Sequence, residues 1–194
     1  ELDEQKEKLE DAKGSLEDQK KDTENKLATA SQALDQLNAL QTDLLTLQAQ
    51  EESLKTTITA IDAMASTKND REIMSGGLGN RISFLQSPTA RGLKSMDYAG
   101  AVGTLTGHGI DIKSLGVTDE KTWKALTQEQ WGAALKKTAD GYQSQKDMLD
   151  GYDDYVSSLN SLQVEKAGVQ AAVSAAEAEL KKSGVSYTDI EKAK

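Results

Sequence analysis

The chain has no cysteine, a single proline, a single histidine and only eight aromatic residues among its 194 residues. The lack of cysteine excludes disulfide bonds, thiolate nucleophiles and cysteine-bound metal ions. Any histidine-based triad or zinc site would have to use His108, which lies between two glycines and is expected in an exposed loop. No segment approaches the ~20 apolar residues of a membrane-spanning helix.

Acidic side chains outnumber basic ones, most of all in the first third of the chain. The net charge is −9, and residues 1–72 contribute −8 of it. Binding to a phosphate backbone or to an anionic membrane needs a surface rich in lysine and arginine. We therefore expect neither nucleic acid nor a membrane surface as the main partner.

Leucines recur at helical spacing along the first third of the chain. Residues 1–66 contain no proline and one glycine, and helix-forming residues dominate, so the sequence predicts one nearly continuous helix. Apolar residues at steps of three, four or seven form a stripe that needs a partner helix: Leu37, Leu40, Leu44, Leu47, Leu54, Ile58 and Ile61. Before Leu27 only Leu2, Leu9 and Leu16 keep a regular step, and we expect this part to bury little.

The middle of the chain is rich in glycine and in helix-capping signals. Nine of the fifteen glycines lie between residues 76 and 116, and residues 76–80 are expected to be too glycine-rich for a stable helix. Asn69 and Glu72 have the spacing of a capping box. Short helices are predicted over residues 88–96 after Ser87, over residues 98–106, and from Thr118-Asp119-Glu120 onward.

A second long helix is predicted to begin at the capping box of Thr127 and Gln130. Its apolar stripe runs from Trp131 to Leu180 at steps of mostly three, four and seven. Three glycines interrupt the stripe, where they mark either close helix approach or a bend: Gly141, Gly151 and Gly168. Two lysines followed by Gly184 predict the end of the helix, and the last ten residues are expected to form a loose tail.

These patterns predict an all-α protein. Two long antiparallel helices form an elongated bundle, with a three-helix bundle favoured, and a small, mostly helical appendage is attached to it. The corresponding boundaries are residues 1–67 for the first long helix, 68–126 for the glycine-rich appendage, and 127–194 for the second long helix and tail.

Few residues suggest catalytic or ligand chemistry. Asp147, Asp150, Asp153 and Asp154 cluster on the second long helix, where a solvated acidic face is favoured over a metal or acid–base site. The segment from Gly77 lacks the third glycine of a dinucleotide loop, and no Gly-Lys-Ser/Thr sequence occurs. We therefore expect no enzymatic activity, cofactor, metal or small-molecule substrate.

Four residues are candidates for partner binding. Trp123 and Trp131 are large aromatics of the kind that anchor interfaces, although filling the core is the favoured interpretation. Arg81 and Arg91, together with Arg71, are the only arginines and form a potential positive patch on an acidic protein.

The chain resembles the minor pilus subunits of type IV secretion and conjugation systems, the VirB-type, TraC-like family. The resemblance rests on the order of elements. A long helix rich in glutamine, leucine and alanine is followed by a glycine-containing junction, a short lobe and a long closing helix. Its local motifs are Ser75-Gly76-Gly77-Leu78-Gly79-Asn80, Ile82-Ser83-Phe84-Leu85 and Ser87-Pro88, followed by a helix that contains Trp123.

The resemblance implies a non-enzymatic pilus component that aids pilus assembly and contact with recipient or host cells. Its partners would be other pilus or secretion-system proteins, and the recipient-cell surface. It also implies a periplasmic and extracellular location, which requires a signal peptide removed before Glu1. The residues also allow two other hypotheses about function. One is a generic coiled-coil adaptor, such as a secretion-tip protein or chaperone, and the other is an enzyme that uses the acidic cluster with a metal.

Overall fold

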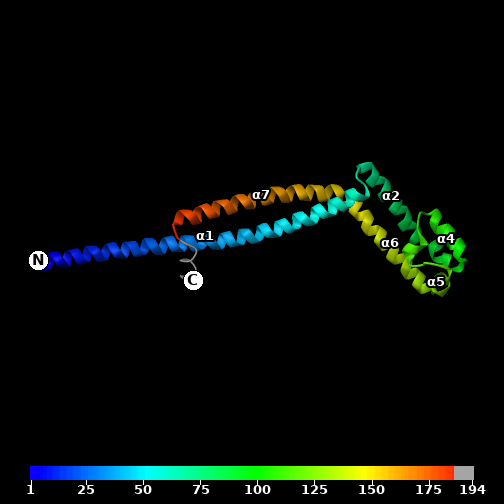
Figure 1. The fold of residues 1–194 in the computed structure, drawn as a ribbon, viewed down its shortest axis with the longest axis horizontal. Coiled ribbons are helices and arrows are strands. Elements are labelled where there is room, and N and C mark those ends of the chain that lie inside the picture. Colours follow the sequence, from blue (N-terminus) through cyan, green and yellow to red (C-terminus); the bar gives the residue numbers. More distant parts are fainter. Residues whose placement is uncertain (186–194) are drawn as a thin grey trace. The chain divides into compact units, whose positions relative to one another are not determined.

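The computed structural model describes residues 1–185, and its regular structure is helical throughout (Figure 1). The all-α prediction is confirmed. The elements are α1 (Leu2–Met64), α2 (Lys68–Leu85), α3 (Pro88–Gly92), α4 (Tyr98–Gly107), α5 (Glu120–Ala125), α6 (Gln128–Asp150) and α7 (Tyr152–Ser183), with short 3₁₀ helices η1 (Leu93–Ser95) and η2 (Ile112–Leu115). The chain forms two compact units: residues 1–52 with the described residues from 159 onward, and residues 53–158.

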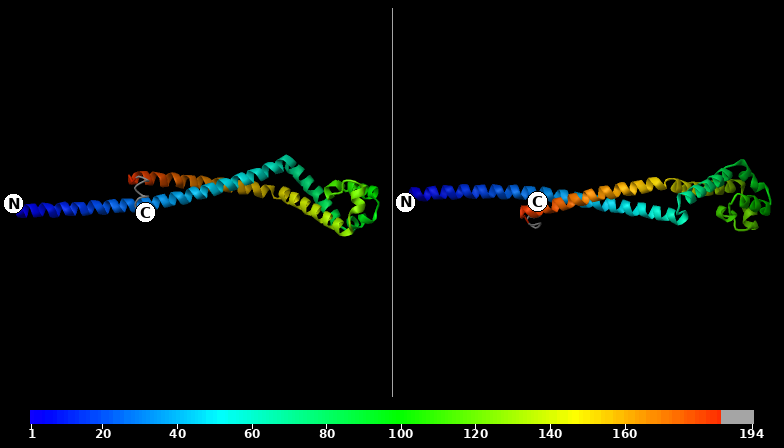
Figure 2. Two further views of the ribbon diagram at one scale, coloured as in Figure 1. Left: turned by 60° about the horizontal axis from the view of Figure 1, so that its bottom comes forward. Right: turned by 90° about the horizontal axis from the view of Figure 1, so that it is seen from above.

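In the first unit, α1 and α7 lie side by side and run antiparallel (Figures 1 and 2). Glu51 pairs with Lys166, whereas Leu34 near the other end packs in the cluster that contains Leu180. This confirms the predicted antiparallel pair of long helices. Within the described residues the unit holds these two helices and no third, because all other helices belong to the second unit.

Residues 1–26, at the start of α1, are all exposed. Leu2, Leu9 and Leu16 are 76%, 72% and 65% exposed, so the row that keeps a step of seven has no partner among the described residues. The expectation that this part buries little is confirmed. A single apolar row flanked by polar residues is too narrow to form a two-helix seam by itself.

The second unit is built on an antiparallel pairing of α2 with α6 (Figure 1). Ser75 contacts Asp150 near one end of the pair, and Leu85 packs in the cluster that contains Leu135 near the other. The prediction that residues 76–80 cannot be helical is wrong, since they lie within α2. Burial of the α2 face that includes Leu78 and Ile82 outweighs the helix penalty of about 1 kcal/mol per glycine.

The start of α2 is capped two residues earlier than the sequence pattern predicts. Thr67 is the N-cap, and its side-chain oxygen accepts a hydrogen bond from the Asp70 backbone N–H at 3.1 Å. The predicted capping box of Asn69 and Glu72 is therefore wrong. Thr67 and Asp70 offer the same three-residue spacing, and the Thr67 hydroxyl also donates to the Asp70 carboxylate at 2.7 Å.

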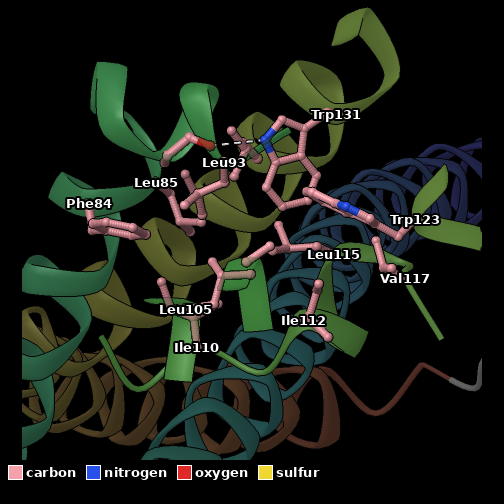
Figure 3. Packing of buried hydrophobic residues seen from close by; sticks show 14 residues of the cluster. Phe84, Leu85, Leu93, Leu105, Ile110, Ile112, Leu115, Val117, Trp123 and Trp131 are labelled. Carbon is pink, nitrogen blue, oxygen red and sulfur yellow. Dashed lines mark hydrogen bonds between the residues drawn. The ribbon is translucent and has the colours of Figure 1, made fainter. Parts of the chain in front are cut away.

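The short helices between α2 and α6 form a lobe at one end of this pair. Ser87, Asp97 and Asp119 cap α3, α4 and α5 through side-chain oxygens, so the short helices predicted there are confirmed. Their apolar faces meet α2 and α6 in one cluster (Figure 3): Phe84, Leu85, Ala90, Leu93, Ala101, Leu105, Ile110, Ile112, Leu115, Val117, Trp123, Trp131, Leu135 and Ala139.

Gly151 divides the predicted second long helix into α6 and α7. A Cβ atom at this position would lie 3.1 Å from the Asp147 carbonyl oxygen and 3.2 Å from the Tyr155 ring, so the backbone passes close to its neighbours there. The bend is confirmed at Gly151 only. Gly141 and Gly168 lie inside continuous helices with nothing within 4 Å of an added Cβ.

The C-terminal end of α7 follows the sequence prediction. The helix ends at Ser183, and Gly184 adopts the left-handed conformation with φ of 67°, as a glycine after a helix C-terminus commonly does. The predicted tail lies outside the described residues from residue 186 onward. No helix in residues 1–185 is both long and apolar enough to span a membrane.

Candidate functional site

The two tryptophans lie in the core of the lobe and not on its surface (Figure 3). Trp131 is fully buried, and its indole Nε1 donates a hydrogen bond to the Ala90 carbonyl oxygen at 2.9 Å. Trp123 packs edge-on against it with 5.0 Å between ring centroids, and its Nε1 donates to the Met96 carbonyl oxygen at 3.3 Å. Buried indoles cannot anchor a partner, so the core-filling interpretation holds for both and the partner-binding assignment does not.

Arg71 is committed to the structure of the second unit. Its guanidinium carbon lies 3.6 Å from the centroid of the Tyr152 ring, and Nη1 lies 3.9 Å from an oxygen of Asp62. Nη1 also donates to the Ala65 carbonyl oxygen at 3.4 Å, beyond the end of α1. Arg71 therefore stabilises the turn between α1 and α2, and its charge is not available for a positive surface patch.

Arg91 and Arg81 line different hollows of the second unit. Arg91 is exposed, and its carbonyl oxygen accepts a hydrogen bond from Gln128 Nε2 at 2.9 Å. The hollow beside it also contains Lys136 and Asp140, which pair with each other at 2.6 Å. The three arginines thus do not gather in a single patch.

Arg81 is half-buried on α2, and its guanidinium lies against an aromatic ring and a glycine. The guanidinium carbon is 5.9 Å from the centroid of the Tyr142 ring. An added Cβ at Gly109 would lie 3.3 Å from both Nε and Nη2 of Arg81. Within the described residues, this guanidinium forms no hydrogen bond and no ion pair.

His108 lies beside Arg81 at the C-terminal end of α4, where the sequence predicts an exposed loop. Its side chain is exposed, as predicted, but its imidazole stacks on the Phe84 ring with 3.7 Å between centroids and 18° between planes. The sequence carries no signal for this stack, because it joins residues on α2 and at the end of α4 that only tertiary packing brings together.

No protein-family model, curated protein or solved structure matches the chain.

The acidic cluster of α6 and α7 contributes to helix packing through one of its members. Asp150 accepts a hydrogen bond from Ser75 Oγ on α2 at 2.5 Å and pairs with Lys146. Asp147 accepts one from Gln143, whereas Asp153 and Asp154 are exposed. Residues 1–185 contain no group of three or more side chains placed to hold a metal ion.

Asp150 in this cluster and Tyr152 beside it have shifted pKa values. Hydrogen bonds from Lys146 and then Ser75 lower the pKa of Asp150, because both stabilise the carboxylate. The hydrogen bond to Asp62 raises the pKa of Tyr152, because loss of the phenolic proton would place two anions side by side. The Ser75 and Asp62 contacts join different helices of the second unit, whereas the Lys146 contact lies within α6.

Replacing Asp150 by asparagine is expected to reduce the loss of stability on acidification. A lowered pKa in the folded state means that Asp150 stabilises the fold above its ordinary pKa of 3.8, and that this contribution disappears as the pH falls through the lowered value. Because the carboxylate is half-exposed, we expect a cost of at most about 1 kcal/mol at neutral pH. Urea unfolding of D150N and wild type between about pH 6 and pH 2 measures both effects.

Asp147→Asn is the matched control for this prediction, since Asp147 accepts from the neutral Gln143 amide on the same helix. It should leave the acid dependence close to that of wild type. Equal acid dependence of D150N and wild type would contradict the role of Asp150.

Proposed function

We propose that this protein is a non-enzymatic minor subunit of a type IV secretion or conjugation pilus, which aids pilus assembly and contact with recipient or host cells. The order of elements supports the proposal: a long helix, a glycine-containing segment, a helical lobe and a closing helix that returns along the first. A subunit of this kind acts through surfaces that other proteins recognise.

One observation carries the proposal. The segment on which the resemblance rests, residues 75–88, forms most of α2 and the turn into α3, and its C-terminal part lies in the wall of the lobe. Leu85 lies in the lobe core, and Ser87 caps α3 by accepting from the Ala90 backbone N–H at 3.1 Å. The family-like motif thus coincides with a packed structural unit that holds a surface in place.

The proposed partners are other pilus or secretion-system proteins and the recipient-cell surface. Of the candidate residues, Arg81 and Arg91 offer side chains to such partners, since both reach hollows at the surface of the second unit. The proposed location is the periplasm and the cell exterior, which requires that the encoding gene specify a signal peptide upstream of Glu1.

Deletion of the encoding gene in its natural host is expected to abolish conjugation or secretion, together with surface pili. The wild-type gene supplied in trans should restore both. Complementation with R81E or R91E is expected to leave the folded protein intact, as judged by its helical circular dichroism, but to lower transfer where the substituted arginine contacts a partner.

Normal transfer and normal pili after deletion would contradict the pilus proposal. They would leave the coiled-coil adaptor, which the antiparallel pair of α1 and α7 and the exposed leucine row of α1 favour. Partners of such an adaptor would be sought by crosslinking through positions in the exposed part of α1.

A further inference from the structure

Two adjoining hollows on the second unit form one continuous surface, because both are lined by Gly77 and Arg81. One hollow presents apolar side chains, and the other presents the stacked pair of aromatic rings. The Arg81 surface is defined here by six residues: Met64, Ile73, Met74, Arg81, Phe84 and His108.

The charge of Arg81 is not balanced within the second unit. In a chain of net charge −9, the described residues supply its half-buried guanidinium with no carboxylate. Asp70 lines the apolar hollow, but its carboxylate accepts the Thr67 hydroxyl at 2.7 Å. A guanidinium presents five N–H donors in a planar fork that matches a carboxylate in two parallel hydrogen bonds, so an external carboxylate is its natural partner.

Two neighbours restrict where the guanidinium can lie. Its carbon is 5.9 Å from the centroid of the Tyr142 ring on α6, and Gly109 lies beside it in the turn after α4. Gly109 has a φ of 69°, which favours glycine, and any larger residue would also press its Cβ against the arginine. A side chain with fewer accessible positions loses less conformational entropy on binding, which favours recognition by this group.

The apolar side chains of the Arg81 surface are more exposed than apolar side chains usually are, and a bound partner would cover them. Ile73 is 67% exposed, and Met64 and Met74 are 38% and 39% exposed. Methionine side chains adapt to different partner shapes and recur at peptide-binding surfaces. These apolar residues lie next to one cation, Arg81. A partner segment that carries apolar side chains and a carboxylate would complement both.

The exposed leucine row of α1 does not have this chemistry. The helical neighbours of Leu9 at steps of three and four are Gln5, Lys6, Ala12 and Lys13, and Lys13 pairs with Glu17 at 4.0 Å. On a second copy, the carboxylate that lies nearest to this row is therefore already paired with a lysine. Charge complementarity therefore favours a different protein as the partner.

We propose that the Arg81 surface binds an acidic amphipathic segment of another protein, with a carboxylate on Arg81 and apolar side chains on Met64, Ile73 and Met74. The assignment concerns binding by the isolated protein and does not depend on the pilus role. A binding measurement in solution tests it, whereas gene deletion tests the proposed function, so either can fail alone.

The test uses the full chain and two capped synthetic peptides, one of alternating leucine and glutamate and one of alternating leucine and glutamine. The glutamate peptide is expected to shift the NMR signals of Arg81 Nε–H and of the Gly77 and Gly109 amides. R81Q should weaken its binding about tenfold, the usual effect of losing one charge-assisted hydrogen-bonded pair. Added salt should weaken binding to wild type more than to R81Q.

Lys137→Gln is the matched control, because Lys137 is an exposed cation of the same unit that lines a different hollow. It should bind the glutamate peptide as wild type does, and M74S should bind it more weakly. Three outcomes would overturn the proposal: equal binding of the glutamine peptide, equal weakening by K137Q, or self-association of the chain that R81Q abolishes. The last outcome would assign the surface to a second copy.

Discussion

Replacing Trp131 by alanine is expected to lower the free energy of unfolding of the second unit by about 3–5 kcal/mol. The side chain is fully buried at the centre of the lobe, where α6 meets the short helices. Its removal leaves a cavity, takes away the edge-on contact with Trp123, and leaves the Ala90 carbonyl without its indole donor. Urea unfolding followed by circular dichroism and by the fluorescence of Trp123 measures the loss.

Trp131→Phe separates the two contributions in the same pocket. It keeps an aromatic ring but removes the N–H donor, so we expect an intermediate loss of about 1–3 kcal/mol. Retained stability of W131A would show that the lobe is not held together by this cluster.

Replacing Leu47 by aspartate is expected to destabilise the first unit by about 3–5 kcal/mol, because it places an unpaired carboxylate in the seam of α1. Leu47 is only 8% exposed, and Glu51 one turn later is also buried, so the new charge would lie near an existing one. Thermal and urea unfolding monitored by helical circular dichroism tests the expectation.

Leu45→Asp is the matched control in the same helix. Leu45 is 67% exposed, and its replacement should change stability by no more than about 0.5 kcal/mol. Equal unfolding of L47D and L45D would show that the leucine stripe is not a packed seam. Leu54 belongs to the same predicted stripe but is only half-buried and lies in the second unit, so L54D should have a smaller effect than L47D.

The features that sequence reasoning predicted correctly depend on nearby residues. Ser87, Asp119 and Thr127 cap helices because their side chains bond to backbone groups three residues away. The long helix α1 follows from helix-forming residues and a regular apolar spacing. Such interactions lie within one turn of the chain and can be recognised without knowing the fold.

The features that it missed depend on contacts between distant segments. The glycines of residues 76–80 remain helical because Ser75 and Leu78 pack toward α6 and its neighbours. The Arg81 surface includes His108 from the end of α4, and Arg81 itself lies near Tyr142 of α6. No local pattern links either residue to Arg81. Arg71, Arg81 and Arg91 lie in different environments for the same reason, because contacts between distant segments decide where each one lies.

The partly buried ion pair between Glu51 and Lys166 favours one alignment of α1 along α7. Glu51 is only 8% exposed, and its carboxylate meets the Lys166 ammonium at 2.6 Å. Sliding one helix by a heptad would set Glu51 opposite Leu159 or Val173. A buried carboxylate beside an aliphatic side chain is strongly disfavoured, so the pair acts as a register lock in a seam whose apolar residues alone would permit slippage.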